Sequence, residues 1–108
     1  MNFSLNIICR KEIAAEKEAQ AKALLTALGI DGSPVFEPYW KDSSLSQLIF
    51  GAPLGTPDFE LIKAHLCTIA GAEVALSASL DEWEFSHYAS IEELVSEKNT
   101  AFIFCNVF

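Results

Sequence analysis

Basic side chains are scarce in this sequence and are absent from nearly a third of it. The 108 residues include seven Lys and Arg against 15 Asp and Glu. No Lys or Arg occurs at the 34 positions from 64 to 97, whereas seven carboxylates do: Glu73, Asp81, Glu82, Glu84, Glu92, Glu93 and Glu97. Residues 1–54 carry a net charge of −1 and residues 55–108 a net charge of −7. Such a field disfavours nucleic acid and anionic membranes as partners and attracts cationic protein surfaces.

Long apolar runs are also missing, since no stretch approaches the roughly 18 residues that a membrane helix requires. The amino-terminal sequence MNFSLNIICRKE has its apolar stretch before its positive charges. A secretory signal has the opposite order, so we expect a cytoplasmic protein that begins in a strand and has no membrane partner.

Cysteine is sparse, and Cys9, Cys67 and Cys105 have no CxxC spacing. Each lies in an apolar segment, where a free thiol behaves as a small hydrophobic side chain. We interpret all three as reduced core thiols in a reducing compartment. A disulfide between Cys9 and Cys105 stays open as an alternative, because the first and last strands could be neighbours.

Catalytic and cofactor-binding motifs are missing as well. The sequence has no GxSxG, GxGxxG or P-loop pattern. His65 and Cys67 are two residues apart on a predicted helix and therefore point to different faces, which disfavours a shared metal. Glu82 and Glu84 could perform acid–base chemistry if buried, but strand alternation puts both on the solvent side. We expect no catalytic residue, no metal site and no cofactor, and hence a protein that is not an enzyme.

What is present is a composition typical of a folded domain. Hydrophobic residues make up 51% of the chain, which excludes intrinsic disorder despite the net charge. The length fits a single domain spanning residues 1–108.

Hydrophobic periodicity predicts the strands. Alternation between apolar and polar residues indicates strands over residues 2–9, 44–50, 73–79 and 82–88. Residues 101–108 are apolar on both faces, as in a central strand that is covered on both sides or lies at a subunit contact. Residues 31–42 contain two prolines and are expected to be irregular or an edge strand.

Helix-forming residues and capping patterns predict three helices. Lys11–Leu28 is rich in Ala, Glu, Lys and Leu, and Gly29 supplies its end. A second helix is expected from Thr56, as the N-cap, to Gly71. A capping box at Ser90 predicts a short third helix that continues to about Glu97.

This order of elements predicts an α+β fold. We expect a mostly antiparallel sheet with two main helices on one face, in a ferredoxin-like or related split β-α-β arrangement, plus the short third helix.

The acidic stretch has two interpretations. It is either a solvated face that keeps an apolar protein in solution, or a docking surface for a basic protein partner. The complete lack of compensating Lys or Arg favours the docking surface, in which aromatic anchors would stand among carboxylates. The candidate partner-binding residues are Asp81, Glu82, Glu84, Tyr88, Glu92, Glu93, Glu97, Tyr39 and Trp40.

In overall type the chain resembles the small acidic immunity proteins that bacteria make against secreted nuclease toxins, as in contact-dependent inhibition systems. The resemblance rests on size, on the acid-rich stretch LDEWEFSHYASIEELVSEK, on buried free thiols and on the absence of catalytic motifs. It implies an inhibitor that binds a cognate toxin domain in the cytosol and occludes a basic active site.

Two other hypotheses remain. One is a small-molecule-binding protein or enzyme of a dimeric ferredoxin-like type, which predicts a cavity lined by Trp83, Phe85, His87 and helix residues. The other is a subunit of a larger assembly. A homodimer is compatible with either hypothesis.

Overall fold

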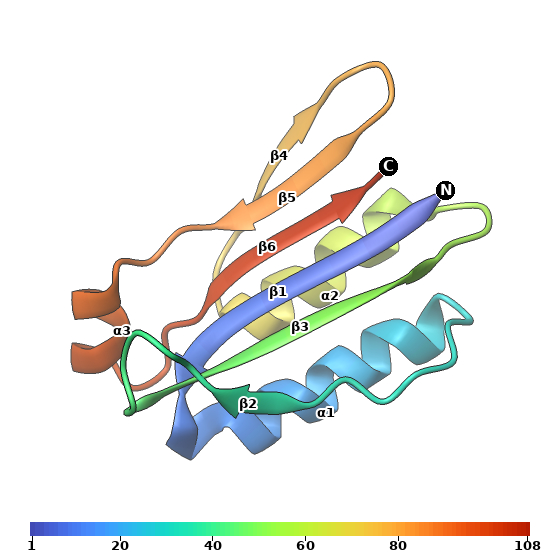
Figure 1. Cartoon of the computed structure of the whole chain (residues 1–108). Coiled ribbons are helices and arrows are strands. Elements are labelled where there is room, and N and C mark those ends of the chain that lie inside the picture. The colour runs from blue at the N-terminus through green and yellow to red at the C-terminus, as the bar shows by residue number, and fades with distance from the viewer.

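The computed structural model of the protein describes all 108 residues. Six strands form one antiparallel sheet in the order β2-β3-β1-β6-β5-β4 (Figure 1). The strands are β1 (Asn2–Arg10), β2 (Phe36–Pro38), β3 (Leu45–Pro53), β4 (Ala75–Ala78), β5 (Trp83–His87) and β6 (Phe102–Val107).

Two long helices, α1 (Lys11–Ala27) and α2 (Phe59–Ala70), pack against each other on one face of the sheet (Figure 1). The short helix α3 (Ile91–Ser96) lies at one end of the sheet, where it contacts β1. The predicted α+β class, with two main helices on one face and a short third helix, is confirmed. No helix in the fold has both the length and the apolar character needed to span a membrane.

The predicted split β-α-β arrangement is also confirmed. Helix α1 connects β1 to β2, and β3 lies between these two strands. Likewise β1 lies between β3, the strand before α2, and β6, the last strand of the chain. The β4–β5 hairpin and α3 are inserted between α2 and β6, so the hairpin extends the sheet beyond β6 on one side.

Element boundaries differ from the predictions by one to three residues, and two of these differences have a clear structural cause. Strand β3 continues to Pro53 because the first residues of β1 pair with it, with Asn2 opposite Pro53. The N-cap of α2 is Asp58 rather than Thr56, because the Asp58 carboxylate accepts a hydrogen bond from the Leu61 amide at 3.1 Å. The predicted end at Gly71 is correct, and this glycine has the left-handed conformation (φ 66°) that a helix end commonly requires.

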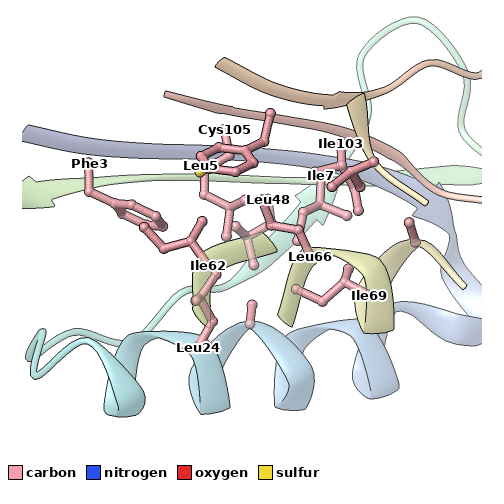
Figure 2. Close-up of a cluster of buried hydrophobic side chains, with 14 of the residues drawn as sticks. Phe3, Leu5, Ile7, Leu24, Leu48, Ile62, Leu66, Ile69, Ile103 and Cys105 are labelled. Atoms are coloured by element: carbon pink, nitrogen blue, oxygen red, sulfur yellow. The ribbon is translucent and has the colours of Figure 1, made fainter. Parts of the chain in front are cut away.

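Apolar alternation on the central strands creates the core (Figure 2). Phe3, Leu5 and Ile7 of β1 point toward the helices, where Ile62 and Leu66 of α2 meet them. Nineteen buried residues join in this one cluster. The central strands therefore have one buried face, and this fixes their register, since a shift by one residue would expose the apolar set.

The two faces make a matched stability test possible. We expect Ile7→Ala to lower the free energy of unfolding by about 3 kcal/mol, because it opens a cavity under α2. Ile49→Ala removes the same atoms from the opposite face of β3, where the side chain is 72% exposed, and should cost less than about 1 kcal/mol. Urea unfolding of both variants measures the difference. Equal losses would contradict the assignment of the buried face.

Candidate functional site

The sheet face turned away from α1 and α2 is covered only at one end. Alternate residues of all six strands point to this side, which we call the open face; they include Ser4, Asn6, Glu37, Gln47, Ile49, Ser77, Glu84, Ser86, Phe104 and Asn106. The prediction that residues 101–108 are covered on both sides is met only in part. Ile103, Cys105 and Val107 are fully buried under the helices, whereas the residues between them are only half-buried.

Helix α3 and the segment between β2 and β3 (residues 39–44, here called the Tyr39 loop) cover one end of the open face. There a small cluster buries Ile8 and Leu45 of the sheet against Ala89 and Leu94. Beside this cluster lies a hollow of about 300 Å³. Its lining residues come from β1, β3, β6, the Tyr39 loop and the start of α3; they include Asn6, Gln47, Phe102, Tyr39, Lys41, Tyr88 and Ile91.

The two tyrosines of this hollow are 49 residues apart in the sequence but line the same depression. The Tyr88 ring meets Phe102 edge-on, with 6.4 Å between ring centroids, and stays 76% exposed. The floor includes one polar pair, in which the Gln47 side-chain amide donates a hydrogen bond to Asn6 Oδ1 at 3.0 Å.

A second hollow, of about 430 Å³, adjoins the first and shares Gln47 with it. Its apolar lining includes Val35, Trp40 and Ile49, and Glu37 is its charged residue. Trp40 is 80% exposed, and its ring centroid lies 6.2 Å from that of Tyr39. We call the two hollows together the aromatic groove.

A short turn holds the two aromatic residues of this segment in place. Asp42 accepts hydrogen bonds from the Ser44 hydroxyl (2.6 Å) and the Ser44 amide (2.9 Å), and these bonds lower the pKa of its carboxyl group. The Tyr39 amide also donates to the Leu45 carbonyl at 3.0 Å. Trp40 therefore projects from a turn that these hydrogen bonds fix, and Lys41 Nζ lies 5.0 Å from the centroid of its ring.

The candidate carboxylates fall into two groups. Asp81 and Glu82 lie in the β4–β5 connection, and Glu84 lies on the open-face side of β5. Glu92 and Glu93 belong to the first turn of α3, and Glu97 is its C-cap. The seven residues from Glu82 to Tyr88 span roughly 20 Å of extended chain, so the two groups stand at opposite ends of the same side of the molecule.

Some of these carboxylates already have partners within the protein. Asn106 Nδ2 donates to Glu82 Oε1 at 2.6 Å, and Thr100 Oγ1 donates to Glu97 Oε2 at 2.8 Å. The Ser90 hydroxyl accepts from the Glu93 amide and donates to Glu93 Oε1, which confirms the predicted cap of α3. Glu84 and Glu92 make no hydrogen bond through their side chains.

No carboxylate of residues 64–97 is neutralised by an ion pair. The protein has a single salt bridge, between Arg10 Nε and Glu12 Oε2 at 2.8 Å. Arg10 also donates to the Val95 carbonyl of α3, so this cation is held at the helix end. Within the aromatic groove Lys41 is the one basic side chain.

Sequence reasoning missed part of the groove. Val35, Gln47 and Ile49 line it and were not predicted; the sequence signal for this region was Ile49, an apolar side chain on the same strand face as Gln47. These residues lie near Tyr88 only because of the strand order, which hydrophobic periodicity in the sequence does not predict.

The remaining chemically active side chains do not converge. No group of three or more His, Cys, Asp or Glu residues is arranged to hold a metal ion. His87 Nδ1 lies 2.8 Å from the Ala101 carbonyl oxygen. Cys9 and Cys105 lie on adjacent strands, but Cys105 is opposite Leu5, roughly 13 Å along β1 from Cys9, which is too far for a disulfide.

Comparison with models of known protein families, with curated proteins and with solved structures finds no match to this chain. Its function must therefore be inferred from the site itself.

The thiols give a test of the buried face. Burial raises the pKa of Cys9 and of Cys105 to about 12, so both stay protonated and unreactive at pH 8. An aromatic disulfide reagent should titrate one thiol, Cys67, in the native protein and three after unfolding. Because the unfolded chain releases these protons near the ordinary thiol pKa, stability should fall as pH rises from about 9 toward 12. Rapid reaction of all three native thiols would contradict this.

Proposed function

We propose that this protein is a non-enzymatic binding module that engages a cationic protein through its open face. In its specific form, the proposal is an immunity-type inhibitor that acts in the cytosol and neutralises a basic nuclease toxin. The partner's active site, built to hold phosphates, would be occluded by a surface that presents carboxylates in their place.

The observation that carries the proposal is the aromatic groove beside unneutralised carboxylates. Trp40, Tyr88 and Ile49 are all more than two-thirds exposed on one side of the molecule. Large aromatic side chains at such positions are typical centres of binding energy in protein interfaces. Since no Lys or Arg pairs with the surrounding acids, a cationic partner would meet charges that need not first be released from an internal ion pair.

The carboxylates would have two different roles in binding, according to whether they already accept hydrogen bonds within the protein. Glu84 and Glu92 have no hydrogen-bond partner, so they are free to steer an approaching cationic surface over several ångströms. Glu82, Glu93 and Glu97 already accept hydrogen bonds from neighbouring side chains. They contribute to the field but have less freedom to form new contacts.

The alternative of a small-molecule binder finds less support. It requires a cavity around Trp83, Phe85 and His87, and none of the three hollows in the protein is lined by these residues. Phe85 is fully buried in the core, and the Trp83 ring packs on Phe59 with 4.5 Å between centroids.

The steering role can be tested by charge reversal. The protein is immobilised, its basic partner is captured from the host lysate at low salt, and association is measured with that partner. We expect the double variant Glu84→Lys/Glu92→Lys to associate about tenfold more slowly and with a weaker salt dependence. Glu16→Lys, on α1, is the control and should leave the rate nearly unchanged. Unaltered association of the double variant, or capture of no basic protein, would refute the proposal.

The anchoring role is tested by truncating aromatic residues. Trp40→Ala and Tyr88→Ala should each weaken binding of the same partner by about 2 kcal/mol or more, mainly through faster dissociation. Phe108→Ala is the matched control, because Phe108 is half-exposed outside the groove. Inhibition of the partner's nuclease activity should follow the same order. Equal effects of all three variants would contradict a role for the groove.

A further inference from the structure

Strand β4 is an outer strand of the sheet with nothing on its free edge. It pairs with β5 on one side only, and all four of its residues are exposed. In Figure 1 the strand lies outermost in the hairpin, beyond the area that α2 covers.

The register identifies which backbone groups point outward. The Ser79 amide donates to the Glu82 carbonyl at 2.8 Å, so this pair is hydrogen-bonded. Because bonded and non-bonded pairs alternate in an antiparallel ladder, Ser77–Glu84 and Ala75–Ser86 are bonded pairs too. The N–H and C=O groups of Leu76 and Ala78 therefore point away from β5 and have no partner.

The two edges of the sheet differ in how they are protected. The β2 edge is three residues long and contains Glu37 and Pro38, features that commonly prevent further pairing. The β4 edge lacks such protection: the seven residues from Val74 to Leu80 include no charge and no proline. An unprotected edge of this kind is a template for an added strand.

The charges around β4 discriminate between two occupants of the edge. If two copies of the protein paired through Leu76 and Ala78, Glu73 of each strand would face Asp81 of the other, at both ends of the contact. Like charges directly opposite each other destabilise a strand pair. The same acids attract an extended segment that carries basic side chains.

We propose that the β4 edge binds an extended, basic segment of a partner protein by antiparallel or parallel strand addition. The identity of the partner as a cationic protein rests on the proposed function, whereas the binding mode rests on the free edge. Leu76 and Ala78 supply main-chain hydrogen bonds, and the acids of the hairpin select for positive charge.

Because side chains alternate between the two faces of a sheet, β4 predicts which residue types should alternate along the bound segment. On the helix side, an added residue would cover Leu76, which is 46% exposed, so an apolar side chain fits there. On the open face, an added residue opposite Ser77 would stand two strands, roughly 10 Å, from Glu84. A lysine or arginine can reach the Glu84 carboxylate across the short Ser77 side chain, so the segment alternates basic and apolar residues.

A synthetic peptide provides the probe. We expect an amidated seven-residue peptide of alternating lysine and valine to shift the β4 amide resonances of the full-length protein and to slow hydrogen exchange at Leu76 and Ala78. Ala78→Pro removes only an outward N–H, the position where an edge strand tolerates proline, and should weaken binding at least about fivefold. Ala78→Thr keeps the N–H and is the matched control. Glu84→Gln should weaken the lysine peptide but not its glutamine analogue.

Four outcomes would overturn the inference: no shift in β4, equal binding by Ala78→Pro and Ala78→Thr, equal affinity for the lysine and glutamine peptides, or a wild-type dimer in sedimentation that Ala78→Pro dissociates. The exchange measurement and Glu84→Gln keep the test valid if the proline variant fails to fold. Loss of peptide binding with retained groove-dependent partner binding would reject strand addition alone. The reverse pattern would reject the groove and leave strand addition in place.

Discussion

The burial of one face of β1 is the constraint on which the rest of the structure depends. This strand sits between β3 and β6 and turns Phe3, Leu5, Ile7 and Cys9 toward the helices, each of them at most 1% exposed. Because side chains alternate along a strand, fixing these four residues also fixes which residues face the other way. The two long helices both pack on the first face, so the second face is covered at one end by α3 and the Tyr39 loop and is otherwise open to solvent or to a partner.

This constraint explains why the fold could be predicted from the sequence while much of the site could not. The strand alternation at residues 2–9, the helix-forming run after Lys11 and the cap at Ser90 are local patterns, and local patterns gave the right elements. The exception at Asp58 is instructive, since Thr56 and Asp58 are both good caps and only the final chain path selects between them. The aromatic groove, by contrast, depends on strand order, which brings Tyr39 and Tyr88 together across the sheet.

The charge pattern was informative about sign but not about arrangement. An uninterrupted acidic stretch suggests a single patch, yet the hairpin and α3 carry its members to opposite ends of one side of the molecule. The distinction between Glu84, which is free, and Glu82, which Asn106 holds at 2.6 Å, also lies beyond the sequence because Asn106 is 24 residues away. The exposed aromatic residues gather in the groove at the covered end of the open face, whereas the carboxylates are divided between the hairpin and α3.

The hydrogen-bonded pair of Gln47 and Asn6 on the groove floor affects which partner surfaces can bind there. Gln47 and Asn6 satisfy each other through one bond, which leaves an amide N–H₂ on Asn6 and a carbonyl on Gln47 to be met by water. A wholly apolar surface bound in this hollow would displace that water and leave both polar groups buried without a hydrogen-bond partner. Each such unsatisfied group costs about 1–3 kcal/mol. The floor therefore disfavours non-specific hydrophobic binding and favours partners that supply their own hydrogen-bond donors and acceptors. For a chain that exposes a tryptophan, this reduces the tendency to aggregate.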